Sequence, residues 1–98
     1  MHARLTTLQM DPGRVDNSIA QLESEDVPQF KQLDGFKGMT VLTDRQSGKT
    51  VAVTFWESEQ AMAGSEEAVT PARGRAAERG GASEPQVERF EVVLDTMA

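Results

Sequence analysis

The sequence contains few side chains that could carry acid–base, nucleophilic or metal chemistry. It has no cysteine and no tyrosine, and His2 is its single histidine. A thiolate zinc site, an iron–sulfur site and a cysteine nucleophile are therefore excluded. One histidine alone does not make a metal-binding constellation, so no metal site is predicted. No glycine-rich phosphate-binding loop and no pair of carboxylates at a catalytic spacing is found in the sequence.

The remaining candidates for a site are large apolar side chains. Trp56 is the only tryptophan, and it can form a flat wall against an aromatic ligand or simply fill the core. Phe30, Met39, Phe55 and Met62 can line an apolar pocket of the kind that binds small molecules, although for each residue taken alone a role in the core is favoured. We therefore choose these five residues as the predicted substrate-binding set, with Trp56 as the best candidate for a catalytic role.

The charged residues are interpreted as solvent-facing. Arg73, Arg75 and Arg79 form the densest basic patch, which could bind an anionic group. Their spacing and the nearby Glu78 favour instead an exposed helix face with local ion pairs. Four acidic residues are also assigned to the surface: Glu57, Glu59, Glu66 and Glu67.

Length and composition restrict the class of protein. The 98 residues suit a single domain over 1–98, and the net charge is −6, from 16 acidic and 10 basic residues. An acidic chain without a basic stripe is repelled by phosphate backbones and anionic lipids, so neither nucleic acid nor a membrane is a predicted partner. No apolar run approaches the roughly 20 residues that span a bilayer, and the first residues lack the apolar core of a signal peptide. A cytoplasmic location is therefore expected.

The first half of the chain predicts three elements. Residues 3–10 alternate in polarity, as in a strand. Residues 12–33 carry apolar side chains at helical spacing, and Pro28 predicts a kink or two short helices there. Residues 36–43 again have the composition of a strand.

The second half predicts a strand, a helix and a strand. Residues 50–56 alternate, with apolar side chains on both faces, and follow a tight turn that ends at Gly48. Ser58 is predicted to cap a helix that restarts at Thr70-Pro71, and residues 86–95 predict the last strand.

This order of elements matches the split β-α-β unit with a central hairpin. We therefore predict an α+β, ferredoxin-like β-α-β-β-α-β domain, with a four-stranded antiparallel sheet and both helices on one face. The strand at 50–56 places Val51, Val53 and Phe55 on one face and Trp56 on the other, so both faces need a cover. A second copy of the chain is the economical cover for the face without helices, and a homodimer is predicted.

Four segments resemble the antibiotic biosynthesis monooxygenase-like (ABM) family of dimeric α/β barrel proteins. In chain order they are Pro-Gln-Phe at 28–30, Gly-Phe-Lys-Gly-Met at 35–39, Asp-Arg-Gln-Ser-Gly at 44–48 and Val-Thr-Phe-Trp-Glu-Ser-Glu-Gln-Ala at 53–61. The resemblance covers about residues 3–95. It implies two ferredoxin-like subunits with their sheets face to face, a last strand that often reaches onto the partner, and a pocket in each subunit between sheet and helices.

The resemblance also implies two kinds of activity. Some members oxidise polyaromatic substrates with O₂ and no metal or flavin, and others bind and degrade haem. Trp56 matches the family's tryptophan at the end of the third strand, but Ala52 stands where quinone-forming members commonly have an asparagine. The tyrosine that some members use is absent, and residues 57–79 lack the histidine that binds haem iron in the haem-degrading members.

The predicted function is therefore a cofactor-independent, monooxygenase-like homodimer that acts on a small apolar or aromatic substrate. The alternative is a non-catalytic small-molecule-binding or regulatory dimeric α/β barrel protein, which the missing asparagine, tyrosine and histidine favour. Haem binding and degradation ranks last among the three hypotheses.

Overall fold

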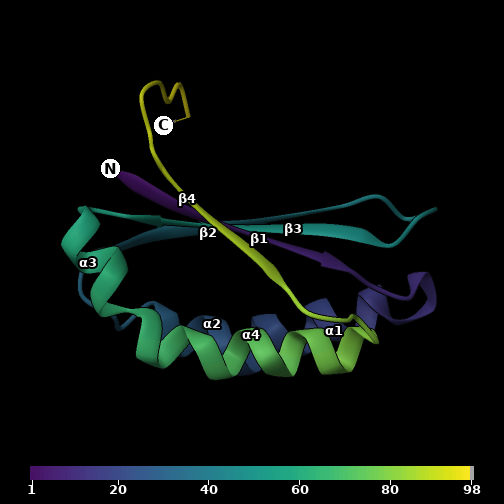
Figure 1. The fold of residues 1–98 in the computed structure, drawn as a ribbon. Coiled ribbons are helices and arrows are strands. Elements are labelled where there is room, and N and C mark those ends of the chain that lie inside the picture. The colour runs from purple at the N-terminus through teal and green to yellow at the C-terminus, as the bar shows by residue number, and fades with distance from the viewer. Residues whose placement is uncertain (98) are drawn as a thin grey trace.

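The computed structural model describes residues 1–97 and shows a four-stranded sheet with helices packed on one face (Figure 1). The strands are β1 (His2–Gln9), β2 (Phe36–Thr43), β3 (Lys49–Trp56) and β4 (Gln86–Glu91). Their order across the sheet is β2-β3-β1-β4, and every neighbouring pair is antiparallel. This confirms the predicted ferredoxin-like arrangement, in which sequence neighbours β2 and β3 form the central hairpin.

The first helical region is built from four short elements. They are η1 (Pro12–Arg14), α1 (Val15–Gln21), η2 (Leu22–Asp26) and α2 (Val27–Phe30). Short helices meet before Pro28, as predicted, and the junction is a π-helical turn in which the Val27 N–H donates to the Leu22 carbonyl. Pro28 has no N–H, and its ring crowds the carbonyl four residues earlier, so a wider turn at this point relieves the conflict.

The second helical region consists of α3 (Glu59–Gly64) and α4 (Glu66–Gly80). Ser58 caps α3 as predicted, because its hydroxyl accepts from the backbone N–H three residues on at 3.1 Å. The predicted restart at Thr70-Pro71 is wrong: the break lies at Ser65, and α4 continues through Pro71. Pro71 and Glu67, four residues earlier, are both exposed, so the carbonyl that loses its partner can be solvated. None of the helices within residues 1–97 is long and apolar enough to cross a membrane.

The core lies between the sheet and the helices and has two parts. One cluster contains Leu22, Phe30, Trp56, Met62, Val69 and Ala72. The other contains Leu8, Met10, Val15, Ala76 and Ala77. Both helical regions contribute residues to each cluster, so the two clusters fix the helices on the same face of the sheet.

The opposite face of the sheet carries no helix in the described part of the chain (Figure 1). We call this the open face. Its large apolar side chains are half-buried or exposed: Leu5, Leu42, Val51, Val53, Phe55 and Phe90. Alternation along β3 separates Phe55 on the open face from Trp56 on the helix-covered face, as the sequence predicted.

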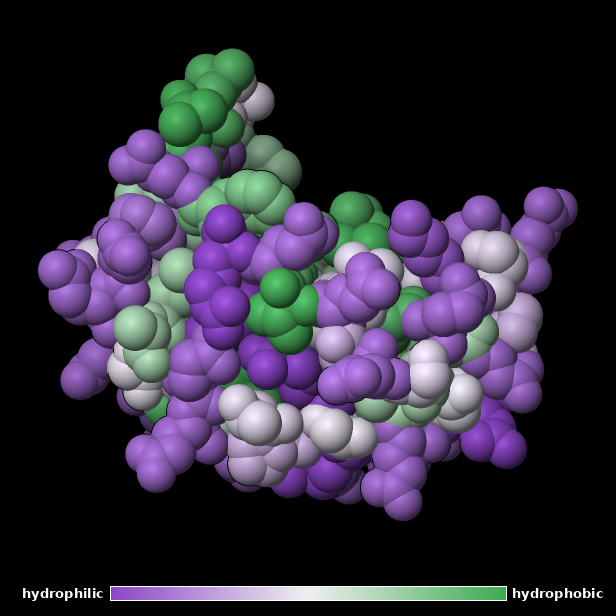
Figure 2. Space-filling model, in the orientation of Figure 1, coloured by the Kyte–Doolittle hydropathy of each residue, from purple (hydrophilic) through white to green (hydrophobic). Residues whose placement is uncertain are grey.

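The last strand is shorter than expected. β4 ends at Glu91 rather than at residue 95: Glu91 pairs with His2, the first residue of β1, and the pairing continues by one backbone hydrogen bond, from the Val92 N–H to the Met1 carbonyl at 2.9 Å. Beyond Glu91 the chain rises from the open face of the sheet (Figure 1). Val93, Leu94 and Met97 are strongly exposed there, and a hydrophobic tip projects at the upper left of the molecule (Figure 2).

Candidate functional site

A cavity of about 50 Å³ lies between the sheet and the helices. Strands β1, β2 and β3 line one side, and the first helical region and α4 line the other. Its apolar lining includes Leu8, Ile19, Phe30, Met39, Val41 and Ala72. A cavity of this volume holds a few water molecules, and this volume is smaller than an aromatic ring system needs.

A groove of about 340 Å³ opens beside this cavity at the edge of β2. The groove and the cavity share Ile19, Leu22, Met39 and Val41, which therefore form the partition between them. The volume of the groove is within the range of small-molecule sites. A ligand whose body occupies the groove can place one end in the cavity by displacing the flexible side chains of this partition, above all Met39.

The structure places the five predicted site residues in three environments. Phe30 and Met39 line the cavity. Trp56 and Met62 are buried in the core cluster that contains Phe30, but neither lines the cavity. Phe55 lies on the open face, on the other side of the sheet. The structure therefore brings four of the five together and separates Phe55 from them.

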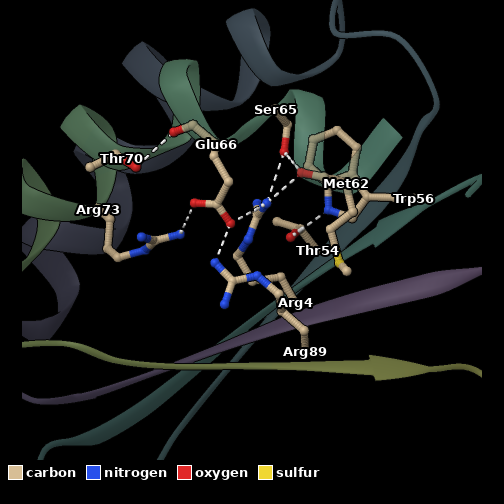
Figure 3. A network of polar contacts seen from close by, with 9 residues as sticks. All are labelled: Arg4, Thr54, Trp56, Met62, Ser65, Glu66, Thr70, Arg73 and Arg89. Carbon is tan, nitrogen blue, oxygen red and sulfur yellow. Dashed lines mark hydrogen bonds and ion pairs between the residues drawn. The ribbon is translucent and has the colours of Figure 1, made fainter. Parts of the chain in front are cut away.

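Arg4 is a buried cation in the cavity lining. It is 1% exposed, and it projects from the middle of β1 toward the helices. Its Nη2 donates to the Met62 carbonyl at 2.7 Å and to Ser65 Oγ at 3.0 Å, and lies 2.8 Å from Glu66 Oε1 (Figure 3). The break between α3 and α4, at Ser65, is thus the place where the helices meet this guanidinium.

Trp56 packs against Arg4 rather than against the cavity. The centre of its ring lies 5.6 Å from Arg4 Cζ, which is within the range of a cation–π contact. Its Nε1 donates to Thr54 Oγ1 at 2.9 Å, and Thr54 does line the cavity (Figure 3). The ring also meets Phe36 edge-on at 5.3 Å between centroids. Trp56 therefore holds two cavity-lining side chains in place without facing the cavity itself.

Glu66 is a carboxylate shared by three arginines. It accepts a hydrogen bond from Arg89, pairs with Arg4 through the same oxygen, and lies 3.7 Å from Arg73 Nη2 through the other (Figure 3). Arg4 and Arg89 are cross-strand partners on one sheet face, where like charges repel unless an anion lies between them. We call Arg4, Glu66, Arg73 and Arg89 the Arg4 cluster.

Two opposing effects set the ionisation of the Arg4 cluster. Partial burial raises the pKa of Glu66, but the Arg89 hydrogen bond and the charges of Arg4, Arg89 and Arg73 outweigh it, so that pKa lies below its ordinary value. Burial lowers the pKa of Arg4, and the charge of Glu66 opposes this in part. A guanidinium stays protonated in proteins, so the cluster carries three positive charges and one negative charge at neutral pH.

The basic patch predicted on one exposed helix face is divided in the structure. Arg73 turns inward to the cavity and to Glu66, so the surface assignment is wrong for Arg73, whereas Glu66 is half-buried. Arg75 and Arg79 do form ion pairs, but with the buried carboxylate of Asp26 in η2, at 2.7 Å and 3.3 Å. Sequence reasoning placed these pairs on α4 itself because only local spacing is visible in a sequence.

One feature of the sequence could have identified Arg4, a cavity-lining residue that the sequence analysis did not choose. Arg4 stands on the same face of its alternating strand as Thr6, Leu8 and Met10, and a charge at an inward position of a strand needs a buried partner. Its partner Glu66 is 62 residues away and resembles any other acidic residue on a helix. The sequence also left undecided which face of the sheet adjoins the cavity. It assigned Phe55 and Trp56 to opposite faces but did not say which of the two faces the helices cover.

Comparison with known sequences gives curated relatives that are uncharacterized, and no family model matches the chain. The uncharacterized proteins Rv2557 and Rv2558 of Mycobacterium tuberculosis (strain ATCC 25618 / H37Rv) are 40% and 38% identical over 92 and 94 residues. These segments are 94% and 96% of this chain but 41% and 39% of the relatives. The chain therefore spans about two fifths of the length of the curated relatives it matches.

Three solved structures resemble the whole chain at low sequence identity. A monooxygenase from the gene ActVA-Orf6 of Streptomyces coelicolor, in complex with the ligand Nanaomycin D, has a TM-score of 0.80 and 17% identity, covering 99% of this chain and 91% of that one. The heme-degrader MhuD of Mycobacterium tuberculosis, with two hemes bound, has a TM-score of 0.76 and 21% identity, covering 99% of this chain and 100% of that one.

The third is SnoaB, a cofactor-independent oxygenase from Streptomyces nogalater, with a TM-score of 0.68 and 16% identity over 97% and 95% of the two chains. Identities this low establish shared architecture and leave activity open. The suspected resemblance is thus confirmed for the fold: this chain has the fold of the antibiotic biosynthesis monooxygenase-like proteins.

Proposed function

We propose that the chain is a monooxygenase-like subunit that binds a small apolar or aromatic substrate in the cavity and groove, needs no cofactor, and acts as a homodimer. The observation that carries the proposal is the apolar cavity between sheet and helices, which adjoins a groove of small-molecule size across a partition of shared side chains. The same fold holds Nanaomycin D in one monooxygenase and is used by a cofactor-independent oxygenase.

The chemistry suits a substrate that reacts with O₂ by itself. In an anthrone, the CH₂ between two aromatic rings becomes C=O. One atom of O₂ becomes the new carbonyl oxygen, and the other leaves with the two hydrogens as water. The substrate provides all the electrons, so the protein needs only to orient the rings, exclude water and stabilise the anion left when a proton departs. Phe30 and Met39 supply apolar contact, and Thr6 and Thr54 place hydroxyl groups in the same lining.

The homodimer is supported by the open face of the sheet. Apolar side chains such as Val53, Phe55 and Phe90 are left half-buried or exposed there, and a large contiguous apolar surface is rarely exposed to water in a monomer. Val93 and Leu94 continue this surface beyond β4 and are more than 80% exposed. A second copy placed face to face covers both features at once.

Oxygen consumption with the anthrone dithranol tests the activity. Ala72 lies on α4, is 2% exposed and lines the cavity, so Ala72→Leu fills part of it. We expect a fall in turnover of at least about ten-fold, with a modest loss of stability from overpacking. Ala68→Leu adds the same side chain to an exposed position of α4 and should leave turnover unchanged. A folded Ala72→Leu protein with full turnover would place the reaction elsewhere.

Light scattering on a size-exclusion column tests the homodimer. The expected molar mass is near twice 10.7 kDa. Val53→Glu puts a charge in the middle of the open face and should give a monomer, whereas Gln46→Glu in the exposed turn before β3 should not. A monomeric wild type would contradict the dimer.

A non-catalytic binding protein is the second candidate, and one observation favours it. Ala52 lines the cavity at the position where the resemblance implies a catalytic asparagine, and its methyl group forms no hydrogen bond with a substrate oxygen. The fluorescence of Trp56, which packs beside the cavity, reports binding. A saturable change with dithranol that is unaccompanied by O₂ consumption would support this candidate over the oxygenase.

Haem does not fit the site. The residues that line the cavity and the groove include no histidine, cysteine or tyrosine to bind its iron, and His2 lies outside both. Nor do residues 1–97 contain a group of His, Cys, Asp and Glu side chains that could hold a metal ion. We therefore derive no step through haem.

A further inference from the structure

We propose that Arg4 and Arg73 form an anion-binding end of the cavity, and that its ligand is an aromatic molecule bearing an ionised oxygen group such as a carboxylate or an enolate. The proposal rests on the proposed function, because it names the ligand class of the same cavity. It concerns the charge of the ligand and leaves the oxidation itself to the preceding proposal.

The first support is a set of unpartnered N–H groups. Nε and Nη1 of Arg4, and Nε and Nη2 of Arg73, are buried and have no hydrogen-bond partner among the described residues. Arg73 Nη2 lies 3.7 Å from Glu66, which is an ion-pair distance but too long for a hydrogen bond. Buried polar groups are rarely left unbonded in proteins, and a charged donor is the costliest to leave so. Both side chains line the cavity, so a ligand that moves in far enough to reach these buried nitrogens can accept their hydrogen bonds.

The second support is the balance of charge in the Arg4 cluster. Glu66 is its one carboxylate, and it already accepts a hydrogen bond from Arg89 and pairs with Arg4. Three guanidinium groups around it leave an excess of two positive charges. A second anion beside Arg4 and Arg73 reduces this excess in an apolar setting, where the attraction is stronger than in water.

The third support is the distance between the mouth of the groove and Arg4. The groove opens at the edge strand β2, and Arg4 lies on β1, two strands further in. Adjacent strands lie about 4.8 Å apart, so Arg4 is about 10 Å inside the edge, roughly the length of a two-ring aromatic acid. The rings then lie between Phe30 and Met39, and the ionised group reaches the guanidinium fork, which matches a planar carboxylate.

Trp56 completes the arrangement as a positioning residue. Its ring packs on the Arg4 guanidinium, and hydrogen bonds from Arg4 Nη2 to the Met62 carbonyl and Ser65 Oγ hold the group as well. The guanidinium is therefore fixed before a ligand arrives, which limits the entropy lost on binding.

The test compares 2-naphthoate with 2-naphthamide, a neutral molecule of the same shape, by isothermal titration calorimetry of the full chain at pH 7. We expect naphthoate to bind at least about ten-fold more tightly, since hydrogen bonds to charged groups are worth that much or more. Arg4→Met should remove this preference and leave naphthamide binding unchanged. Arg73→Gln should reduce the preference in part. Arg45→Gln, which alters an exposed arginine outside the cavity and the groove, is the matched control and should behave as wild type.

The outcomes separate this proposal from the proposed function. Equal binding of naphthoate and naphthamide to the wild type would overturn the anion site and leave the apolar site standing. A preference for naphthoate that survives Arg4→Met and Arg73→Gln would overturn the assignment of these residues. Dithranol turnover without any binding of naphthoate would overturn the anion site alone. A naphthoate preference lost on Arg4→Met, in a protein that consumes no O₂, would support the anion site and contradict the oxygenase.

A variant that retains the charge covers the case in which Arg4→Met does not fold. Arg4→Lys keeps one positive charge but loses the two-pronged donor geometry, so naphthoate should bind more weakly than to wild type and still more tightly than naphthamide. Unchanged naphthoate affinity in Arg4→Lys would mean that the fork of Arg4 does not contact the carboxylate, and this too would overturn the proposal.

Discussion

Two buried ionic groups in this molecule are satisfied to different degrees. Asp26 in η2 is 1% exposed, and each of its carboxylate oxygens accepts a hydrogen bond, one from Arg75 and one from Arg79 of α4. We call these three residues the Asp26 clamp. Arg4 in β1 is equally buried, but two of its nitrogens have no partner within residues 1–97.

The difference indicates what each group is for. The Asp26 clamp joins the π-helical turn to α4, and its buried carboxylate is complete without any further molecule. The Arg4 cluster has more positive charge than its one carboxylate offsets, and its unbonded donors adjoin a cavity. Arg79 Nε also lacks a partner among the described residues, but Arg79 does not line that cavity. A charge that is satisfied supports structure, whereas the charge left unsatisfied beside the cavity is the one that we propose binds the ligand.

The largest expected effect belongs to the Asp26 clamp. Asp26→Asn leaves two arginines facing a neutral group, and Arg79 is 13% exposed, so breaking the pair should cost about 3 kcal/mol of unfolding free energy. Urea denaturation followed by circular dichroism measures this loss. Naphthoate binding to the folded variant should not change. A cost below about 1 kcal/mol would show that the clamp is no more than a surface ion pair.

The second effect is the pH dependence conferred by Glu66. Because its pKa is lower in the folded protein than in the unfolded chain, its ion pairs stabilise the fold above the ordinary carboxyl pKa of about 4.3. That stabilisation is lost as the pH falls through the lowered value. The difference in unfolding free energy between wild type and Glu66→Gln should therefore be constant above about pH 5 and shrink below about pH 4. A difference that does not vary between pH 2 and pH 7 would contradict the ion pairing.

The third effect concerns the stability of Arg4→Met. The mutation removes a buried cation with two unbonded donors and puts an apolar side chain of similar length in its place. Glu66 is partly exposed and keeps Arg89 and Arg73 as partners after the exchange, so no buried charge is left unpaired, and we expect a change within about 1 kcal/mol in thermal denaturation. Ser65 Oγ still donates to the Met62 carbonyl, so that acceptor keeps a partner. A loss as large as that of Asp26→Asn would make the two clusters equivalent and remove the contrast between them.

The smallest effect is a reference for the other three. Asp16 and Arg45 form an ion pair at 2.8 Å with both side chains mostly exposed. Asp16→Asn should change the unfolding free energy by less than about 0.5 kcal/mol in the same urea experiment. A larger change would mean that exposed pairs in this chain are unusually strong, and the values for the buried clusters would have to be scaled down.

The fold could be predicted from the sequence because its signals are local. Alternation in residues 50–56, the cap at Ser58 and the interruption before Pro28 each depend on neighbours within a few positions. The restart expected at Thr70-Pro71 failed because a proline at an exposed position need not end a helix when its lost carbonyl partner is replaced by water.

The site was less predictable because it depends on contacts between distant segments. Phe30 and Met39 were correctly placed inside the protein, since an apolar type is enough for that, and both line the cavity; that they bind a substrate stays a prediction. Arg4, Glu66 and Arg73 were not, because each looks like a surface residue until β1 and α4 are brought together. Phe55 shows the same limit, since alternation assigns it a face but does not say which face the helices cover.

The most direct test of the cavity as a ligand site is NMR of the protein with ¹³C-labelled methionine methyl groups and bound 2-naphthoate. Met10 and Met39 line the cavity, Met62 is buried beside it, and Met1 and Met97 are exposed. We predict intermolecular NOEs from naphthoate to Met39 and Met10, with a shift of the Trp56 indole N–H signal. NOEs to Met1 or Met97 alone, with Met39 unperturbed, would contradict the account.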